Sequence, residues 1–298
     1  MNKSEYLNQP EVIDFLAWFE RLDHDDNPSP FNHKYEIETR GRGTTKTPWA
    51  CTSLYNAYEK YSWRFSYTDL FTDKKIKGTS YSVSKKALDD FQNRLHDSII
   101  RNCNETCYKA CNMILDWGGV LGSEKKGNKK RLLELKPCLT KHLSEVKSIF
   151  ESNEVTLGKK YTIVENKNET QIAMNAGFTK IYSLLCTDFI IYDGRVGAAL
   201  SLLVRYFLQQ KNPKPSLVPE SLSFYYGQAR NKNVNRNPSL DPYIFRALSN
   251  SPAVHIRNNL KANWIVSEFS KNTASKFKDQ NNPSRCIEAA LFMIGYKV

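Results

Sequence analysis

The sequence predicts a mainly α-helical fold with minor β structure in its first third. Apolar residues recur with a helical period over most of the chain, and the clearest stripe joins Val196, Ala199, Leu200, Leu203, Val204 and Phe207. Strand-like composition is confined to short pieces at 34–39 and 161–164. No internal sequence repeat and no long linker divides the chain.

The expected helices follow from these stripes in chain order. Residues 11–22 form an amphipathic helix with Pro10 at its start, where proline is favourable. Residues 84–115 form one long helix or two in line, which Trp117-Gly118-Gly119-Val120 ends. Further helices are expected at 139–150, 179–185, 194–207 and 258–269, and from Pro283 to Gly295.

The region before residue 83 is harder to assign. We expect residues 1–82 to hold the first helix and an irregular or β region, and residues 83–298 to form a helical core with a hairpin near 170–195. The basic loop 40–46 lacks the spacing of a phosphate-binding nucleotide loop, although its cations can contact a DNA backbone. The aromatic run 55–67 either packs in the interior or stacks on bases.

Charge points to an anionic partner. The net charge is +12, and residues 205–298 carry fourteen Lys and Arg against five Asp and Glu. Residues 1–40 instead carry four basic against nine acidic residues. This asymmetry suggests a basic face on the C-terminal part, but it does not distinguish DNA from RNA or acidic lipid.

The seven cysteines, without paired spacing, predict reduced thiols in a cytoplasmic protein. Residues 1–15 have no uninterrupted apolar core, so we expect no signal peptide, and no apolar run approaches the length of a membrane span. Cys103, Cys107 and Cys111 share one helical face, but no fourth ligand follows at a suitable spacing. We therefore expect buried thiols and no metal.

The stretch 170–207 organises the chain. A short helical run is followed by the apolar segment Phe189-Ile190-Ile191-Tyr192, then by Asp193 and a second helix. A carboxylate at this point can accept hydrogen bonds from the first free backbone N–H groups, and the helix dipole favours its charge. A capping role alone accounts for Asp193.

A second interpretation rests on resemblance. The segments TKIYSLL and FIIYDGRV resemble the Lys…Asp core of the helix-hairpin-helix DNA glycosylases, specifically bacterial proteins with the 8-oxoguanine DNA glycosylase fold. Residues 114–120 and 287–295 extend the resemblance, which covers roughly residues 85–298. The hairpin reads Asn175-Ala176-Gly177-Phe178-Thr179-Lys180, where the family has P-G-x-G-[TS]-K. The spacing from Lys180 to Asp193 is thirteen residues, about one helical turn shorter than in the family.

The resemblance implies two helical subdomains with a cleft that receives a base flipped from duplex DNA. It implies Lys180 as the nucleophile that attacks C1′ and forms a Schiff base, and Asp193 as an ionised group that stabilises positive charge on the sugar. A lysine serves this role only as a neutral amine. No metal or other cofactor and no bound nucleotide is expected.

The resemblance also places duplex DNA near the hairpin. Backbone N–H groups at such a hairpin face a phosphate, which assigns Gly177 and Thr179 to DNA binding. Arg195 is also assigned to DNA binding, although it can alternatively form a structural ion pair. Two basic segments are assigned to the same role. They are the loop with Lys125, Lys126, Lys129 and Lys130, and the polar run 228–238 with Arg230, Lys232 and Arg236. The basic loop can equally be a solvated linker.

Several alternatives remain open at this point. If Lys180 does not reach the sugar, Asp193 can still assist hydrolysis by water. The rival class is a DNA-binding protein that keeps the fold without the chemistry, and a third is an RNA-binding or scaffolding helical domain. The sequence does not name the base, although an oxidised purine is the default of the family and a bulky modified base is the other option.

Overall fold

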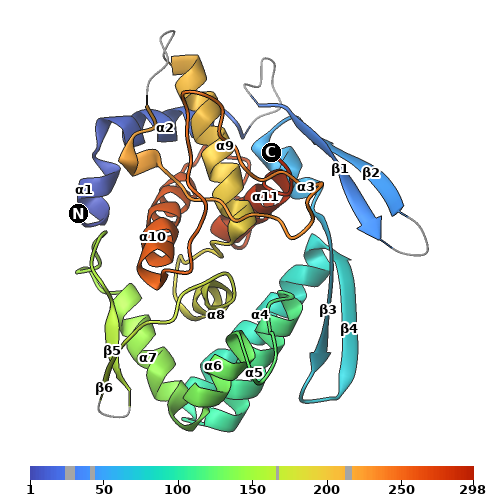
Figure 1. Cartoon of the computed structure of the whole chain (residues 1–298), viewed down its shortest axis with the longest axis vertical. Coiled ribbons are helices and arrows are strands. Elements are labelled where there is room, and N and C mark those ends of the chain that lie inside the picture. Colours follow the sequence, from blue (N-terminus) through green and yellow to red (C-terminus); the bar gives the residue numbers. More distant parts are fainter. Residues whose placement is uncertain (24–30, 41–43, 166–167, 212–216) are drawn as a thin grey trace. The chain divides into compact units, whose positions relative to one another are not determined.

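A computed structural model describes residues 1–23, 31–40, 44–165, 168–211 and 217–298. Helices dominate these residues, and the strands form three separate two-stranded antiparallel sheets (Figure 1). The predicted mainly α-helical class is therefore confirmed. Residues 41–43 of the predicted basic loop lie outside the described residues.

The chain divides into two compact units whose segments interleave along the sequence. The first unit comprises Met1–Glu5, Ser62–Asp193 and Ser249–Asn263, and the second comprises Tyr6–Tyr61, Gly194–Leu248 and Trp264–Val298. The sequence instead predicted a division at residue 82. The predicted cleft between two helical subdomains stays a prediction.

Helices form the centre of the first unit. They are α4 (Tyr81–Ile100), α5 (Asn104–Trp117), α6 (Asn128–Leu135), the short 3₁₀ helix η1 (Lys136–Cys138), α7 (Leu139–Phe150), α8 (Phe178–Leu185) and most of α10 (Pro252–Phe269). α8 packs against α4, α5 and α7. Its side chains are buried along its whole length.

α4 and α5 are separate helices that are not in line, which corrects the prediction that 84–115 forms one long helix or two in line. Asn102, between them, has a φ of 48°, a left-handed conformation that asparagine tolerates better than most residues. This turn folds α5 back against α4. Both helices of this pair contact α7 and α8.

Two ribbons complete the first unit. β3 (Ser62–Asp69) pairs with β4 (Lys74–Ser80), and β5 (Thr162–Glu165) pairs with β6 (Asn168–Gln171). The buried face of β3 packs on the helices, where the rings of Tyr67 and Phe91 lie 4.8 Å apart and those of Phe65 and Trp117 6.1 Å apart. Part of the aromatic run 55–67 is thus core.

The second unit is built around α9 (Gly194–Lys211). α2 (Pro10–Glu20) and α11 (Pro283–Ile294) pack against it. The unit also contains α3 (Leu54–Glu59), which packs on α11, the 3₁₀ helix η2 (Glu220–Leu222) and the ribbon of β1 (His33–Arg40) and β2 (Thr44–Cys51). The short α1 (Lys3–Leu7) precedes α2. Phe15 and Trp18 of α2 pack on Phe207 of α9. None of the described helices is long and apolar enough to cross a membrane.

Candidate functional site around Lys180 and Asp193

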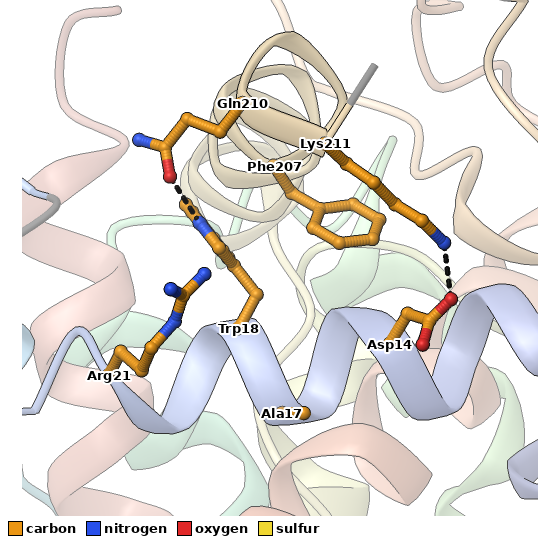
Figure 2. A pocket seen from close by; sticks show the side chains of 7 residues that line it. All are labelled: Asp14, Ala17, Trp18, Arg21, Phe207, Gln210 and Lys211. Carbon is orange, nitrogen blue, oxygen red and sulfur yellow. Dashed lines mark hydrogen bonds and ion pairs between the residues drawn. The ribbon is translucent and has the colours of Figure 1, made fainter.

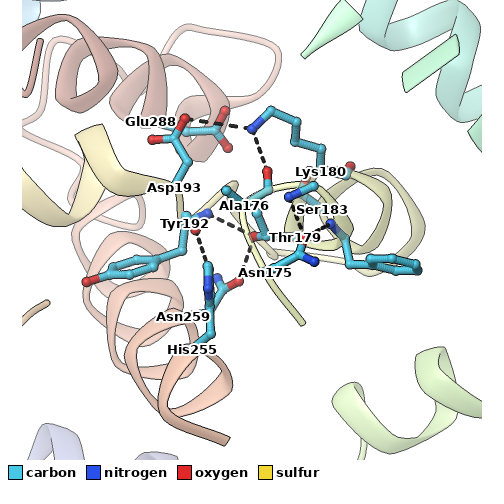
Figure 3. A network of polar contacts seen from close by, with 12 residues as sticks. Asn175, Ala176, Thr179, Lys180, Ser183, Tyr192, Asp193, His255, Asn259 and Glu288 are labelled. Atoms are coloured by element: carbon cyan, nitrogen blue, oxygen red, sulfur yellow. Dashed lines mark hydrogen bonds and ion pairs between the residues drawn. The ribbon is translucent and has the colours of Figure 1, made fainter. Parts of the chain in front are cut away.

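Lys180 is buried within the first unit, with only 5% of its surface exposed. It lies in the first turn of α8, where its Nζ donates a hydrogen bond of 2.7 Å to the carbonyl oxygen of Ala176. The same Nζ lies 3.7 Å from Oδ2 of Asp193, the residue immediately before α9 (Figure 3). The two residues that the sequence paired are therefore in contact despite their short spacing.

Gly118 makes room for this lysine. It caps the C-terminus of α5, and a Cβ atom at this position would lie 2.5 Å from Cδ and 2.6 Å from Cε of Lys180. Such distances are well inside van der Waals contact. The lysine stem therefore runs directly over the backbone at the end of α5.

The turn before α8 is fixed by Asn175. Its Oδ1 accepts hydrogen bonds from the backbone N–H groups of Gly177, at 2.7 Å, and Phe178, at 3.1 Å. These donors lie at the start of α8, whose N-cap residue is Gly177, and Asn175 satisfies them from two residues before that cap. The carbonyl oxygen of Ala176, between the two residues, accepts from the lysine amine.

Asn128 ties the basic loop to this turn. Its Nδ2 donates to the carbonyl oxygen of Val120 at 2.7 Å, and its Oδ1 accepts from Nδ2 of Asn175 at 2.9 Å. A Cβ atom on Gly177 would lie 2.1 Å from Nδ2 of Asn128, so a larger residue here would displace the Asn128 amide. Loop 121–128 and turn 175–177 therefore form one polar junction.

The predicted basic loop is shorter than expected. Lys125 and Lys126 are exposed in it, but Lys129 and Lys130 lie on α6. Nζ of Lys129 is 3.0 Å from a Glu124 carboxylate oxygen, and Nζ of Lys130 is 3.6 Å from one of Glu134. The unpaired positive charge next to the turn thus comes mainly from Lys125 and Lys126.

Polar side chains of α10 hold the apolar segment 189–192 in a non-repetitive conformation. Oδ1 of Asn263 accepts from the N–H of Ile190 at 2.9 Å, and Nδ2 of Asn259 donates to the carbonyl oxygen of the same residue at 3.1 Å. Because buried backbone groups need partners, these amides replace the strand pairing that the segment lacks. They fix the approach of the chain to Asp193.

Thr179 and His255 hold the end of this segment (Figure 3). The hydroxyl of Thr179 accepts from the N–H of Tyr192 at 2.9 Å and donates to Oδ1 of Asn259 at 2.7 Å. Thr179 is fully buried. Its hydroxyl therefore positions Tyr192, and the predicted contact with DNA does not use this side chain.

His255 is neutral in this setting. Nε2 lies 2.7 Å from the carbonyl oxygen of Tyr192, and because a carbonyl only accepts, Nε2 carries the hydrogen. Burial lowers the pKa of His255 to about 4, against a smaller opposing effect of that hydrogen bond. The imidazole thus supplies a hydrogen-bond donor without adding a buried charge near Lys180.

Arg195 belongs to the second unit and is also buried. Its guanidinium lies 4.3 Å from the ring centroid of Phe292 and 5.0 Å from that of Tyr296, a cation–π arrangement. The carbonyl oxygen of Arg195 would be 1.8 Å from a Cβ on Gly295. These contacts give Arg195 a packing role between α9 and the end of α11.

The remaining predicted cations lie on an irregular segment of the second unit. Arg230 and Lys232 are exposed, whereas Nε of Arg236 donates to the carbonyl oxygen of Tyr296 at 3.3 Å. Asn235 and Asn237 stabilise the segment by accepting bonds from backbone N–H groups two residues further on, as in Asx turns. Arg230 and Lys232 are therefore available to an anion.

A groove of about 490 Å³ lies between α2 and α9 in the second unit (Figure 2). Trp18, Phe207 and Ala17 contribute apolar surface. Its polar groups largely satisfy one another, since Nε1 of Trp18 donates to Gln210 at 2.7 Å and Lys211 pairs with Asp14. This groove contains none of the predicted site residues.

Comparison with protein-family models, curated proteins and solved structures finds no match for the chain. Within the part of the chain that the structure describes, no group of three His, Cys, Asp or Glu side chains is placed to hold a metal ion. The sequence analysis assigned no site role to Gly118, Asn128, Asn175, His255 and Asn259. The i, i+4 repeat of Asn259 and Asn263 was the available signal for the last of these.

Proposed function

We propose that the protein is a DNA base-excision enzyme, a glycosylase with β-elimination lyase activity. The observation that carries the proposal is the contact between the buried Lys180 and the half-buried Asp193, with Nζ 3.7 Å from the carboxylate. Buried ionisable groups cluster at functional sites, and desolvation is one way in which a lysine becomes a nucleophile. The reaction that we propose is the one implied by the sequence resemblance to the helix-hairpin-helix DNA glycosylases.

In the proposed reaction, the neutral amine of Lys180 attacks C1′ of a flipped deoxynucleotide. The new C–N bond forms as the glycosidic bond breaks, and the base leaves with the bonding electrons and takes up a proton. Opening of the sugar ring then gives a protonated Schiff base. Loss of a C2′ proton expels the 3′ phosphate, and water releases the enzyme.

Asp193 would act through its charge. Positive charge develops on the sugar as the base departs, and a carboxylate in a water-poor site stabilises it more strongly than it would in bulk water. The same carboxylate lies next to the amine that must give up a proton before attack. Gly118 and the Asn175 turn would be positioning residues for Lys180.

A second candidate is a DNA-binding protein without chemistry, and one observation favours it. Two acceptors near Nζ of Lys180, the carbonyl of Ala176 and the carboxylate of Asp193, stabilise an ammonium group. An ammonium group is not a nucleophile. Lys180 would then be a structural ion-pair partner at the junction of loop and turn.

Base release from duplex oligonucleotides tests the proposal. Substrates carry 8-oxoguanine, a bulky modified base or only normal bases, and the products are treated with alkali to cleave abasic sites. We expect cleavage at one lesion class, lost in Asp193→Asn. Salt-sensitive binding without release from any substrate would favour the second candidate, and preferential competition by RNA would favour an RNA-binding domain.

A further inference from the structure

The β3–β4 ribbon of the first unit has one buried and one exposed face. Phe65 and Tyr67 point to the helices, and alternation along a strand sends Arg64, Ser66 and Thr68 to solvent. In the antiparallel register Ser66 lies opposite Lys77, and Thr68 lies opposite Lys75. The outer face is thus defined as Arg64, Ser66, Thr68, Lys75 and Lys77, all exposed.

The cations of this outer face have no carboxylate partner. Among the residues that the structure describes, Arg64, Lys75 and Lys77 form no ion pair and no side-chain hydrogen bond with another residue. Lysines on the helices of the same unit behave differently: Lys136 pairs with Glu105, Lys141 with Glu145 and Lys147 with Glu151. The ribbon therefore concentrates uncompensated positive charge on a regular scaffold.

Three acids lie near this face without being part of it. Asp116 of α5 accepts the backbone N–H of Thr68 at 2.9 Å, so its carboxylate lies beside β3. Asp69 is on the buried face, where it accepts from the N–H of Phe71 and lies 3.8 Å from a guanidinium nitrogen of Arg94. Asp73 occupies the turn at the tip, with a φ of 55°. None of the three residues belongs to the outer face defined above.

We infer that the outer face of the β3–β4 ribbon contacts the phosphate backbone of duplex DNA. Arg, Lys, Ser and Thr are the side chains that most often reach phosphate oxygens, and this face consists of them alone. Successive outward residues lie roughly 6.6 Å apart, so they can meet a series of charges along a strand. A two-stranded ribbon is also narrow enough to enter the major groove.

This inference rests on the proposed function for its partner, but it uses residues that take no part in excision. It requires only that the ribbon and the duplex meet through charge. The resulting contact is independent of sequence, because phosphates carry no base information. It should therefore strengthen binding to DNA duplexes of any sequence to a similar degree.

The test is the salt dependence of duplex DNA binding by the full chain. One variant combines Arg64→Gln, Lys75→Gln and Lys77→Gln, and a matched control combines Lys136→Gln, Lys141→Gln and Lys147→Gln. Each phosphate contact contributes about 0.9 to the slope of log affinity against log salt concentration. We expect the magnitude of this slope to fall by roughly 2 to 3 in the ribbon variant and by less than about 1 in the control.

Other outcomes overturn the inference. An unchanged slope in the ribbon variant would remove the ribbon from the interface and leave base excision standing. Equal decreases of the slope in the two variants would mean that net charge alone causes the effect. Tighter binding of duplex RNA than of duplex DNA would contradict the DNA partner. Absence of any binding by the wild type would reject the proposed function as well, and thermal melts establish that both variants are folded.

Discussion

The stem of Lys180 lies directly over Gly118, with its Cδ 2.5 Å from where a Cβ at that glycine would be. The end of α5 thus sets the position of the amine in α8. A helix-ending glycine, which a sequence suggests only as a stop signal, serves here as the surface on which the candidate nucleophile packs.

Gly118→Ala should therefore displace Lys180. The added methyl group forces the lysine stem off its position or moves α5, and overpacking of this kind costs about 1–3 kcal/mol. Denaturant unfolding of Gly118→Ala, Lys180→Ala and the double variant measures the coupling. We expect the alanine at 118 to be less destabilising when Lys180 is also alanine, and additive effects would show that the two side chains do not meet.

Gly177 and Asn128 form a second steric pair. An alanine at 177 would bring its Cβ within 2.1 Å of Nδ2 of Asn128, whose amide is held on both sides by hydrogen bonds. Gly177→Ala should destabilise by about 1–3 kcal/mol. Asn128→Ala removes the obstacle at the cost of two hydrogen bonds, so the double variant should lie close to Asn128→Ala alone in a thermal melt. A double variant whose loss of stability equals or exceeds the sum of the two single losses would contradict this geometry.

His255 predicts a dependence of stability on pH. Its pKa of about 4 in the folded chain lies below the ordinary 6.5, so the unfolded chain takes up the proton first as pH falls. The contribution of neutral His255 to the free energy of unfolding is fully present above pH 6.5. It is lost progressively as the pH falls from 6.5 to 4, by about 1.4 kcal/mol per pH unit at most. His255→Gln, which retains a donor, should show a flatter stability curve across this window than the wild type.

Other groups titrate in the same pH range, so the free energy of unfolding of His255→Gln is compared with that of the wild type at each pH. Asp193 and Lys180 act on His255 in opposite directions, and His33 has a pKa lowered by burial. A His255→Gln curve parallel to the wild type between pH 4 and pH 6.5 would mean that His255 is not buried as a neutral ring.

The cysteines should differ in reactivity. Cys103, at the N-cap of α5, is partly exposed, and hydrogen bonds from the Thr106 hydroxyl and backbone lower the pKa of its thiol. Burial raises the pKa of Cys186 to about 12. Iodoacetamide at neutral pH should therefore label Cys103 well before Cys186 in the folded protein, as peptide mass spectrometry would show, and equal labelling rates would contradict this order.

Apolar periodicity was sufficient to predict the helices whose buried faces are apolar. The limits of α2, α7 and α11 match the expected ranges within two residues. α10 begins at Pro252, six residues before the predicted start, because its first turns bury His255, Asn258 and Asn259 instead of an apolar stripe. A pattern of hydrophobicity cannot identify a helical face that exists to bind backbone groups.

At the candidate site, too, local sequence predicts some features and tertiary contacts determine the others. The capping position of Asp193 follows from local sequence, since the acid immediately precedes an apolar stripe. Its contact with Lys180 depends on how segment 189–192 runs, and that path is set by amides of α10 located about 70 residues further along the chain. The roles of Gly118 and Asn128 depend on tertiary contacts alone.

Borohydride trapping tests the central claim most directly. The wild type, Lys180→Ala and Lys141→Ala, an exchange of a lysine that pairs with Glu145, are incubated with a duplex bearing an abasic site and with one bearing 8-oxoguanine. A Schiff base through Lys180 predicts a covalent protein–DNA band in the wild type and in Lys141→Ala that is absent in Lys180→Ala. A band that persists in Lys180→Ala, or no band in the wild type on either duplex, would contradict Lys180 as the nucleophile.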